Sequence, residues 1–156
     1  MKKLCAGLLV CAALAGCSTT SNVMMGNPDQ TKPIHTVAFT PQGGNSADMD
    51  NYIQRDLLSR GVDVKAMAAP GTRKMTNVDA VVSYSDTWRW DLVMYLKSLD
   101  ISIFDASSGS LLISGHWENS ALHGFQDPAG VINQVMDEMF SKMGWTKPDK
   151  VGEAAH

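Results

Sequence analysis

The side chains that are best suited to hold a metal lie near one another late in the chain. His116 and His123 are seven positions apart, with Glu118 between them. Imidazole and carboxylate groups are common zinc ligands, but a site needs them to converge. His116 and Glu118 share one face of an expected strand, whereas His123 falls beyond the start of the next loop. We therefore expect exposed polar residues here, with no metal site and no cofactor.

Four aspartates, Asp86, Asp91, Asp100 and Asp105, are candidates for acid–base chemistry. Asp100 alternates with serines, which is typical of a solvated strand face. Asp91 and Asp105 fall at expected turns, where aspartate accepts local backbone hydrogen bonds. No serine lies in a Gly-x-Ser-x-Gly elbow, and residues 71–74 lack the spacing of a phosphate-binding loop. The sequence predicts no catalytic residue.

Trp88 and Trp90 are the possible partner-binding residues. On a strand, both rings lie on the same face as Val82 and Tyr84. Exposed rings would stack on a sugar or dock a protein. Buried rings would instead cover the sheet beneath a helix, which is the more common situation for tryptophan. We expect at least one of the two in the core.

Cys17 is the one thiol with a defined sequence context. Lys2 and Lys3 precede an apolar run over residues 4–14, and the small residues Ala15 and Gly16 follow. This order is typical of a secretory signal, and the run is too short for a stable transmembrane helix.

Leu14-Ala15-Gly16-Cys17 resembles the lipobox of bacterial lipoproteins. The resemblance implies that a signal peptidase recognises Leu14, Ala15 and Gly16, cuts before Cys17, and leaves a thiol that receives a lipid anchor. Ser18 stands where an aspartate would retain enteric lipoproteins in the inner membrane, so it implies the outer membrane, facing the periplasm. An ordinary secretory signal with a chance cysteine is the alternative.

Charge and cysteine content limit the functions of the processed chain. Removing residues 1–16 from 156 leaves 140, with 11 basic and 16 acidic residues, a net charge of −5. Such a chain is a poor nucleic-acid binder. Cys5 and Cys11 leave with the signal, so no disulfide is expected.

Composition and periodicity divide the chain into four parts. Residues 1–16 form the cleaved signal, 17–32 a flexible tether rich in small polar residues, 33–146 an α+β domain, and 147–156 a frayed tail. Within the domain we expect strands over 33–40, 62–66, 78–90, 92–105 and 111–118, and helices over 46–60 and 128–143. This order predicts a two-layer sandwich: a mixed sheet of about five strands with two helices on one face.

Alternation predicts which residues of the last two strands face the core. The expected inward residues are Val93, Tyr95, Leu99, Ile101, Ile103, Leu111, Ile113 and Trp117, whereas Ser98, Asp100, Ser102, Ser114, His116 and Glu118 point outward.

The hairpin Asp105-Ala106-Ser107-Ser108-Gly109-Ser110-Leu111-Leu112, followed by a terminal amphipathic helix, resembles small periplasmic lipoprotein domains. It is also similar to αβ domains of lipoproteins that activate penicillin-binding proteins or secrete curli, and to the N-terminal domain of TolB-type proteins. The resemblance implies a non-enzymatic binding or assembly accessory, with an envelope protein or a glycan as partner. A small envelope hydrolase or transferase and a purely structural or stress-related component are the alternatives.

Overall fold

The computed structural model describes residues 19–26, 32–41, 46–120 and 125–145. The expected signal over 1–16, Cys17, His123 and the expected tail over 147–156 lie outside these ranges. The elements are β1 (Thr20–Met25), β2 (Thr36–Thr40), α1 (Ala47–Ser59), β3 (Asp63–Met67), β4 (Ala80–Asp91), β5 (Val93–Asp105), β6 (Leu111–Glu118) and α2 (Pro128–Lys142).

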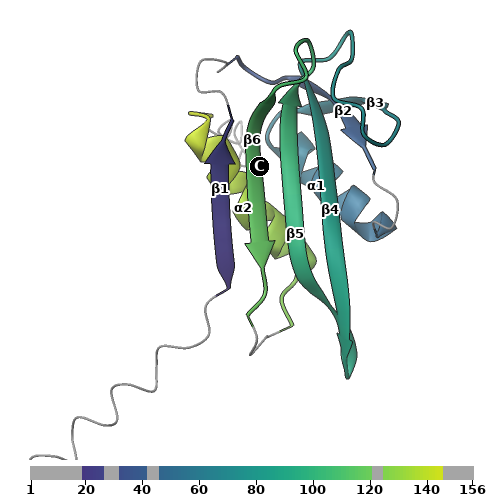
Figure 1. Cartoon of the computed structure of the whole chain (residues 1–156), viewed down its shortest axis with the longest axis vertical. Helices are drawn as coiled ribbons and strands as arrows, with labels where there is room; N and C mark the ends of the chain where they lie inside the picture. The colour runs from purple at the N-terminus through teal and green to yellow at the C-terminus, as the bar shows by residue number, and fades with distance from the viewer. Residues whose placement is uncertain (1–18, 27–31, 42–45, 121–124, 146–156) are drawn as a thin grey trace, which may run out of the picture.

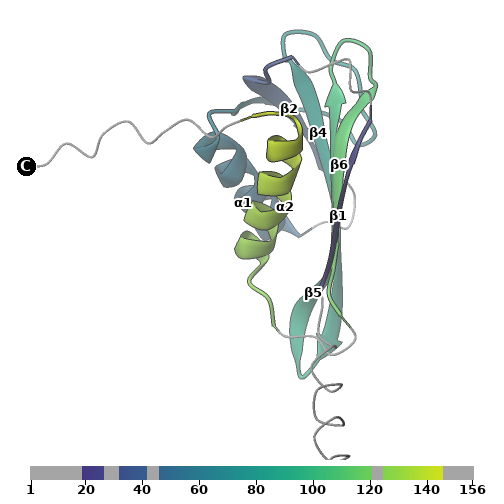
Figure 2. The same ribbon diagram turned by 90° about the vertical axis from the view of Figure 1, so that its left-hand side faces the viewer.

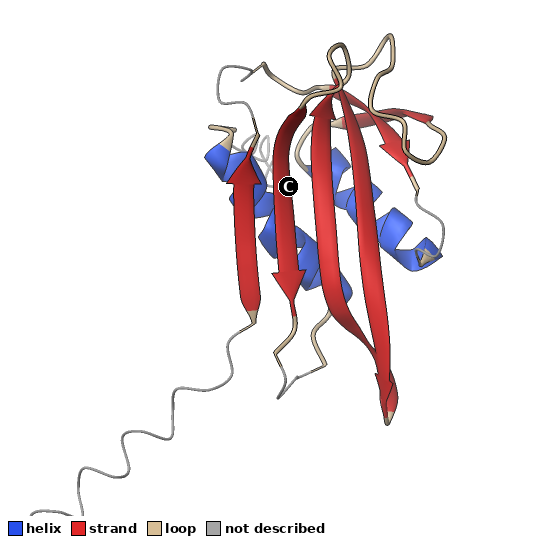
Figure 3. Cartoon of the chain, in the orientation of Figure 1, coloured by secondary structure: helices blue, strands red, loops and turns tan. Residues whose placement is uncertain are grey.

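The strands form one mixed sheet in the order β1-β6-β5-β4-β2-β3 (Figures 1 and 3). β2 pairs with β3 and β4 in parallel, and all other pairs are antiparallel. The expected α+β class and the antiparallel second half are confirmed. The sheet has six strands, however, and not the expected five.

Both helices lie against the same face of the sheet (Figure 2). Their apolar stripes meet the inward residues of the strands in a single core, whose largest members include Phe39, Ile53, Leu57, Tyr84, Trp117 and Phe140. Gly61, with φ of 78°, follows α1 as expected, because a left-handed residue ends a helix at little cost when it is glycine. Within the described ranges, neither helix is long and apolar enough to cross a membrane.

The sixth strand, β1, comes from the segment that we predicted to be a flexible tether, and that prediction is wrong for residues 20–25. β1 pairs with β6 along its whole length. Val23 is buried, Ser21 donates a hydrogen bond to Glu138 (3.0 Å), and Lys142 donates one to the Val23 carbonyl (2.7 Å). The alternation of Ser21, Val23 and Met25 toward α2 outweighs the polar composition of the segment.

Two irregularities change the expected inward faces. Between Thr87 and Trp88 the register with β5 passes from Ser98 to Leu96, so Lys97 is the extra residue. The alternation reverses there: Leu96 is buried, whereas Val93, which we expected in the core, is exposed, and Tyr95 is only partly buried.

The second irregularity lies between β5 and β6. Phe104 pairs with Leu111 directly after Ile103 pairs with Ile113, so Leu112 is the extra residue. Leu112 enters the main core, and Leu111 packs instead against a small cluster on the opposite sheet face. The prediction that Leu111 faces the main core is therefore wrong, because a bulge moves every residue beyond it to the other face.

Gly115 lets α2 approach β6 closely. A Cβ atom built there would lie 2.6 Å from Cγ1 of Val135 and 2.8 Å from Sδ of Met139. Since both neighbours are fully buried, they have little room to move. The position of α2 therefore depends on the absence of a side chain at residue 115.

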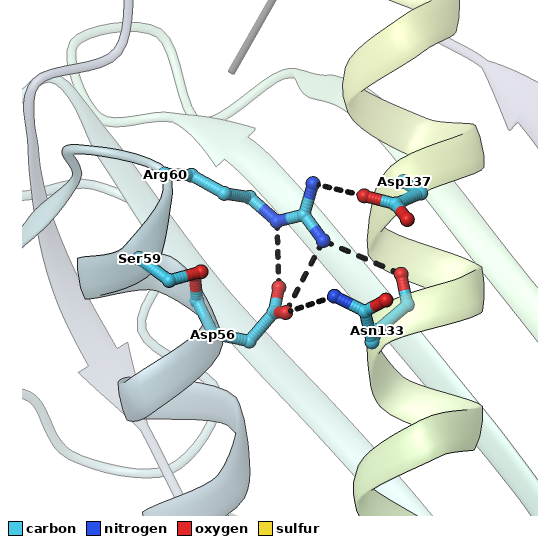
Figure 4. A network of polar contacts seen from close by, with 5 residues as sticks. All are labelled: Asp56, Ser59, Arg60, Asn133 and Asp137. Carbon is cyan, nitrogen blue, oxygen red and sulfur yellow. Dashed lines mark hydrogen bonds and ion pairs between the residues drawn. The ribbon is translucent and has the colours of Figure 1, made fainter. Parts of the chain in front are cut away.

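Arg60 ties the two helices together at the end of α1 (Figure 4). Its guanidinium donates to Asp56 (2.6 Å) and to Asp137 of α2 (2.7 Å), and it lies over the ring of Phe140. Asn133 completes the network by donating to Asp56 (2.9 Å). Burial disfavours the charged form of Arg60, but its hydrogen bonds to both carboxylates and their negative charges outweigh burial and raise the pKa of Arg60 above its usual value.

We expect Arg60→Ala to cost about 3–5 kcal/mol of unfolding free energy, because it leaves the carboxylate of Asp56 buried without its cation. Asp137→Asn is the matched control: its side chain is 57% exposed, so its loss should cost less than about 1 kcal/mol. Urea denaturation of the purified domain measures both. Similar losses of unfolding free energy in the two variants would contradict the burial of the Arg60–Asp56 pair.

Candidate functional site

The β4–β5 hairpin extends beyond the rest of the sheet (Figure 1). Thr87, Ser98, Glu118 and Thr20 form one row across β4, β5, β6 and β1. β6 ends at this row and β1 begins at it. Beyond the row, β4 and β5 alone continue through the pairs Trp88–Leu96, Arg89–Tyr95, Trp90–Met94 and Asp91–Val93.

Trp88 joins this extension to the body of the domain. Its ring packs against the main core, and its Nε1 donates a hydrogen bond to Asp86 Oδ2. The same oxygen accepts from the backbone N–H of Ser46 at the start of α1 (3.3 Å). Trp88 also lines an open hollow with Ser46, Asp48 and Met94. The expectation that at least one of the two tryptophans lies in the core is met only in part, because Trp88 is partly buried and packs against the core.

Trp90 has a different environment. It is 71% exposed, and three further apolar side chains beside it are also exposed: Leu92 (85%), Val93 (47%) and Met94 (55%). Leu92 occupies the turn with a positive φ of 60°, which is uncommon for a leucine. We call Trp90, Leu92, Val93 and Met94 the apolar tip.

The apolar tip was only partly found from the sequence. Trp90 was a candidate, but Leu92 was unassigned and Val93 was expected in the core. The tip could have been predicted from the apolar residues on both sides of the turn at Asp91, because turns usually carry polar residues.

A polar face lies on the side of the sheet opposite the helices. It is made of Thr20, Asn22, Ser85, Thr87, Ser98, Asp100, His116 and Glu118. Further along the same side, the loop over residues 68–79 covers a second small core of Ala38, Val81, Phe104 and Ala106. The polar face is the part of this side that borders the hairpin extension.

His116 and Glu118 are partnered within the polar face. His116 Nδ1 lies 2.6 Å from Asp100 Oδ1, but its Nε2 is 4.0 Å from Glu118. Glu118 instead pairs with Lys97 (3.1 Å), whose hydrogen bond and charge lower the pKa of Glu118. The described residues contain no group of three or more potential metal ligands, and His123 lies outside them.

Two other carboxylates accept hydrogen bonds at the opposite end of the sheet, Asp105 from its own turn and Asp79 from the start of β2. Hydrogen bonds from the hydroxyls of Ser107 and Ser108 and from the Ser108 N–H lower the pKa of Asp105 to about 2. Burial raises the pKa of Asp79, but hydrogen bonds from the backbone of His35 and Thr36 outweigh it and lower the pKa. The turn role expected for Asp105 is confirmed.

No family model matches the chain, and no curated protein matches it. Among solved structures it is similar to a PelC dodecamer from Paraburkholderia phytofirmans, with 15% identity over 81% of this chain and 97% of that chain and a TM-score of 0.53. TolB from Acinetobacter baumannii is 10% identical over 78% of this chain and 31% of that chain, with a TM-score of 0.42.

A minor lipoprotein from Acinetobacter baumannii is 11% identical over 71% of this chain and 85% of that chain, with a TM-score of 0.36. TolB and a lipoprotein are two of the kinds of protein named by the sequence resemblance, but these two scores are too low to support an argument. The likeness to PelC shows a shared fold and nothing more.

Trp88 and Trp90 should differ in their contribution to stability. We expect Trp88→Ala to cost about 1–3 kcal/mol, less than a fully buried tryptophan because its ring is only partly covered. Trp90→Ala should stay within about 0.5 kcal/mol of the parent, since its ring is exposed. Thermal unfolding of the two variants compares them directly, and a Trp90 variant as destabilised as the Trp88 variant would contradict this placement.

Proposed function

We propose that this protein is a lipid-anchored lipoprotein of the bacterial envelope that acts as a non-enzymatic binding or assembly accessory on the periplasmic side. Cleavage before Cys17 and lipid attachment to its thiol would hold the chain on the membrane, with the outer membrane favoured by Ser18. The single observation that carries the proposal is the position of Cys17. It ends a charged-then-apolar segment and stands three residues before the first strand.

The polar face supports a binding role. It extends across β1, β6, β5 and β4, and many of its side chains offer hydrogen-bond donors and acceptors to a partner. The side chains of His116 (42% exposed) and Asp100 (53% exposed) lie open to solvent on this face. An open surface of this kind is suited to contact a protein, or a glycan, over a wide area.

Lipidation is tested by metabolic labelling of cells with a clickable fatty acid. We expect the parent chain to carry the label and Cys17→Ala to lose it, because the thiol is the proposed attachment point. Cys11→Ala is the matched control, since its thiol lies within the segment to be removed and its loss should leave labelling unchanged. Equal labelling of the parent and the Cys17 variant would exclude the anchor.

Partner binding is tested by photo-crosslinking in intact cells. A photoreactive residue at Ser85 of the polar face should give defined adducts to an envelope protein. The same residue at Arg55, an exposed position on α1, should give few, because α1 covers the other side of the sheet. Adducts that form equally from both positions would argue against the polar face as the binding surface.

A further inference from the structure

The apolar tip groups four exposed apolar side chains at the free end of one hairpin. Other large exposed apolar residues, such as Leu58 and Met67, lie singly on other elements. Phe125 is the exception: it is 61% exposed and packs edge-on against Tyr95 near the base of the extension. An exposed cluster of this kind marks a contact surface, whereas single exposed residues need no explanation.

The strand register gives the distance between the apolar tip and Thr20, where the first strand begins. Four residue pairs of the hairpin extend past the row that contains Thr20. At about 3.3 Å per residue, the tip lies about 13 Å beyond Thr20. Because β1 is antiparallel to β6, it begins at the end of the sheet from which the hairpin extends (Figure 1).

The distance from Cys17 to the first strand is similar to the length of the hairpin extension. Two residues, Ser18 and Thr19, separate it from Thr20, and the three steps from Cys17 to Thr20 reach at most about 10 Å. A lipid on Cys17 therefore holds the first strand within about 10 Å of the membrane surface. The hairpin extends by a similar length in the same direction, so an anchored domain brings its apolar tip to the lipid.

We propose that the apolar tip inserts into the interfacial layer of the membrane that holds the lipid on Cys17, so that the domain is attached at two points. This inference depends on the proposed lipid anchor. Tryptophan is favoured at the interface because its ring is apolar and its N–H is polar, and Leu92, Val93 and Met94 add apolar area. Arg89 and Asp91, both exposed, limit the depth to the headgroup region.

The experiment uses the full chain as it is processed and purified from the expressing bacterium, reconstituted into phosphatidylethanolamine–phosphatidylglycerol vesicles. With Cys5 and Cys11 removed and the Cys17 sulfur acylated, Leu92→Cys provides one thiol for an environment-sensitive fluorophore. Thr76→Cys, exposed in the loop before β4 at the other end of the sheet, is the matched control. Flotation of the vesicles reports the anchor, and nitroxide groups on shallow lipid positions report contact between lipid and fluorophore.

We expect both labelled proteins to float with the vesicles. The label at residue 92 should emit at shorter wavelength and be quenched by the nitroxide lipids at least about twofold more than the label at residue 76. Adding Trp90→Asp should reduce that quenching, because it places a charge in the tip. Leu58→Asp, a similar change at an exposed site on α1, should not.

The other outcomes separate this inference from the proposed function. If the proteins float but both labels remain in water, the second attachment is wrong and the anchor stands. If the label at residue 92 shifts in emission without being quenched by the lipids, protein covers the tip, and the membrane contact is again wrong. If the proteins do not float, the anchor is absent, and both proposals fail.

Discussion

The structure depends on a mismatch in length between its strands and its helices. β5 has 13 residues and spans about 43 Å, whereas α2 has 15 residues and spans about 22 Å. Two helices of this size cannot cover a hairpin of that length. The buried residues of β4 and β5 consequently extend only as far as Tyr84 on one strand and Leu96 on the other. The remainder of the hairpin is held by its own ladder of hydrogen bonds and by Trp88.

The network around Arg60 and the close approach at Gly115 hold the helices in place over the sheet. The guanidinium joins the end of α1 to the middle of α2, and Gly115 allows α2 to lie close to β6. The pair between Arg60 and Asp137 fixes the two helices relative to each other, and the close contact at Gly115 fixes α2 relative to β6. The exposure of the apolar tip is thus a consequence of packing elsewhere in the domain.

The regular parts of the fold could be predicted from the alternation of apolar and polar residues. The irregular parts could not. The helices, the turn at Asp105 and the inward positions of Leu99, Ile101 and Ile103 follow from periodicity alone. The bulges at Lys97 and Leu112 could not be predicted, because each depends on pairing with another strand. β1 was missed for the same reason: its stability comes from β6 and α2, whereas its own composition is that of a loop.

The membrane anchor and the orientation of the domain are inferred from different parts of the chain. The anchor is inferred from the first 17 residues alone, whereas the direction of the sheet is defined by the register of β1 on β6. Since β1 begins so soon after Cys17, an anchored domain has little freedom to turn over. Insertion of the tip would hold the strands upright on the membrane. The polar face would then stand at the side of the molecule, open to a partner that approaches along the membrane surface.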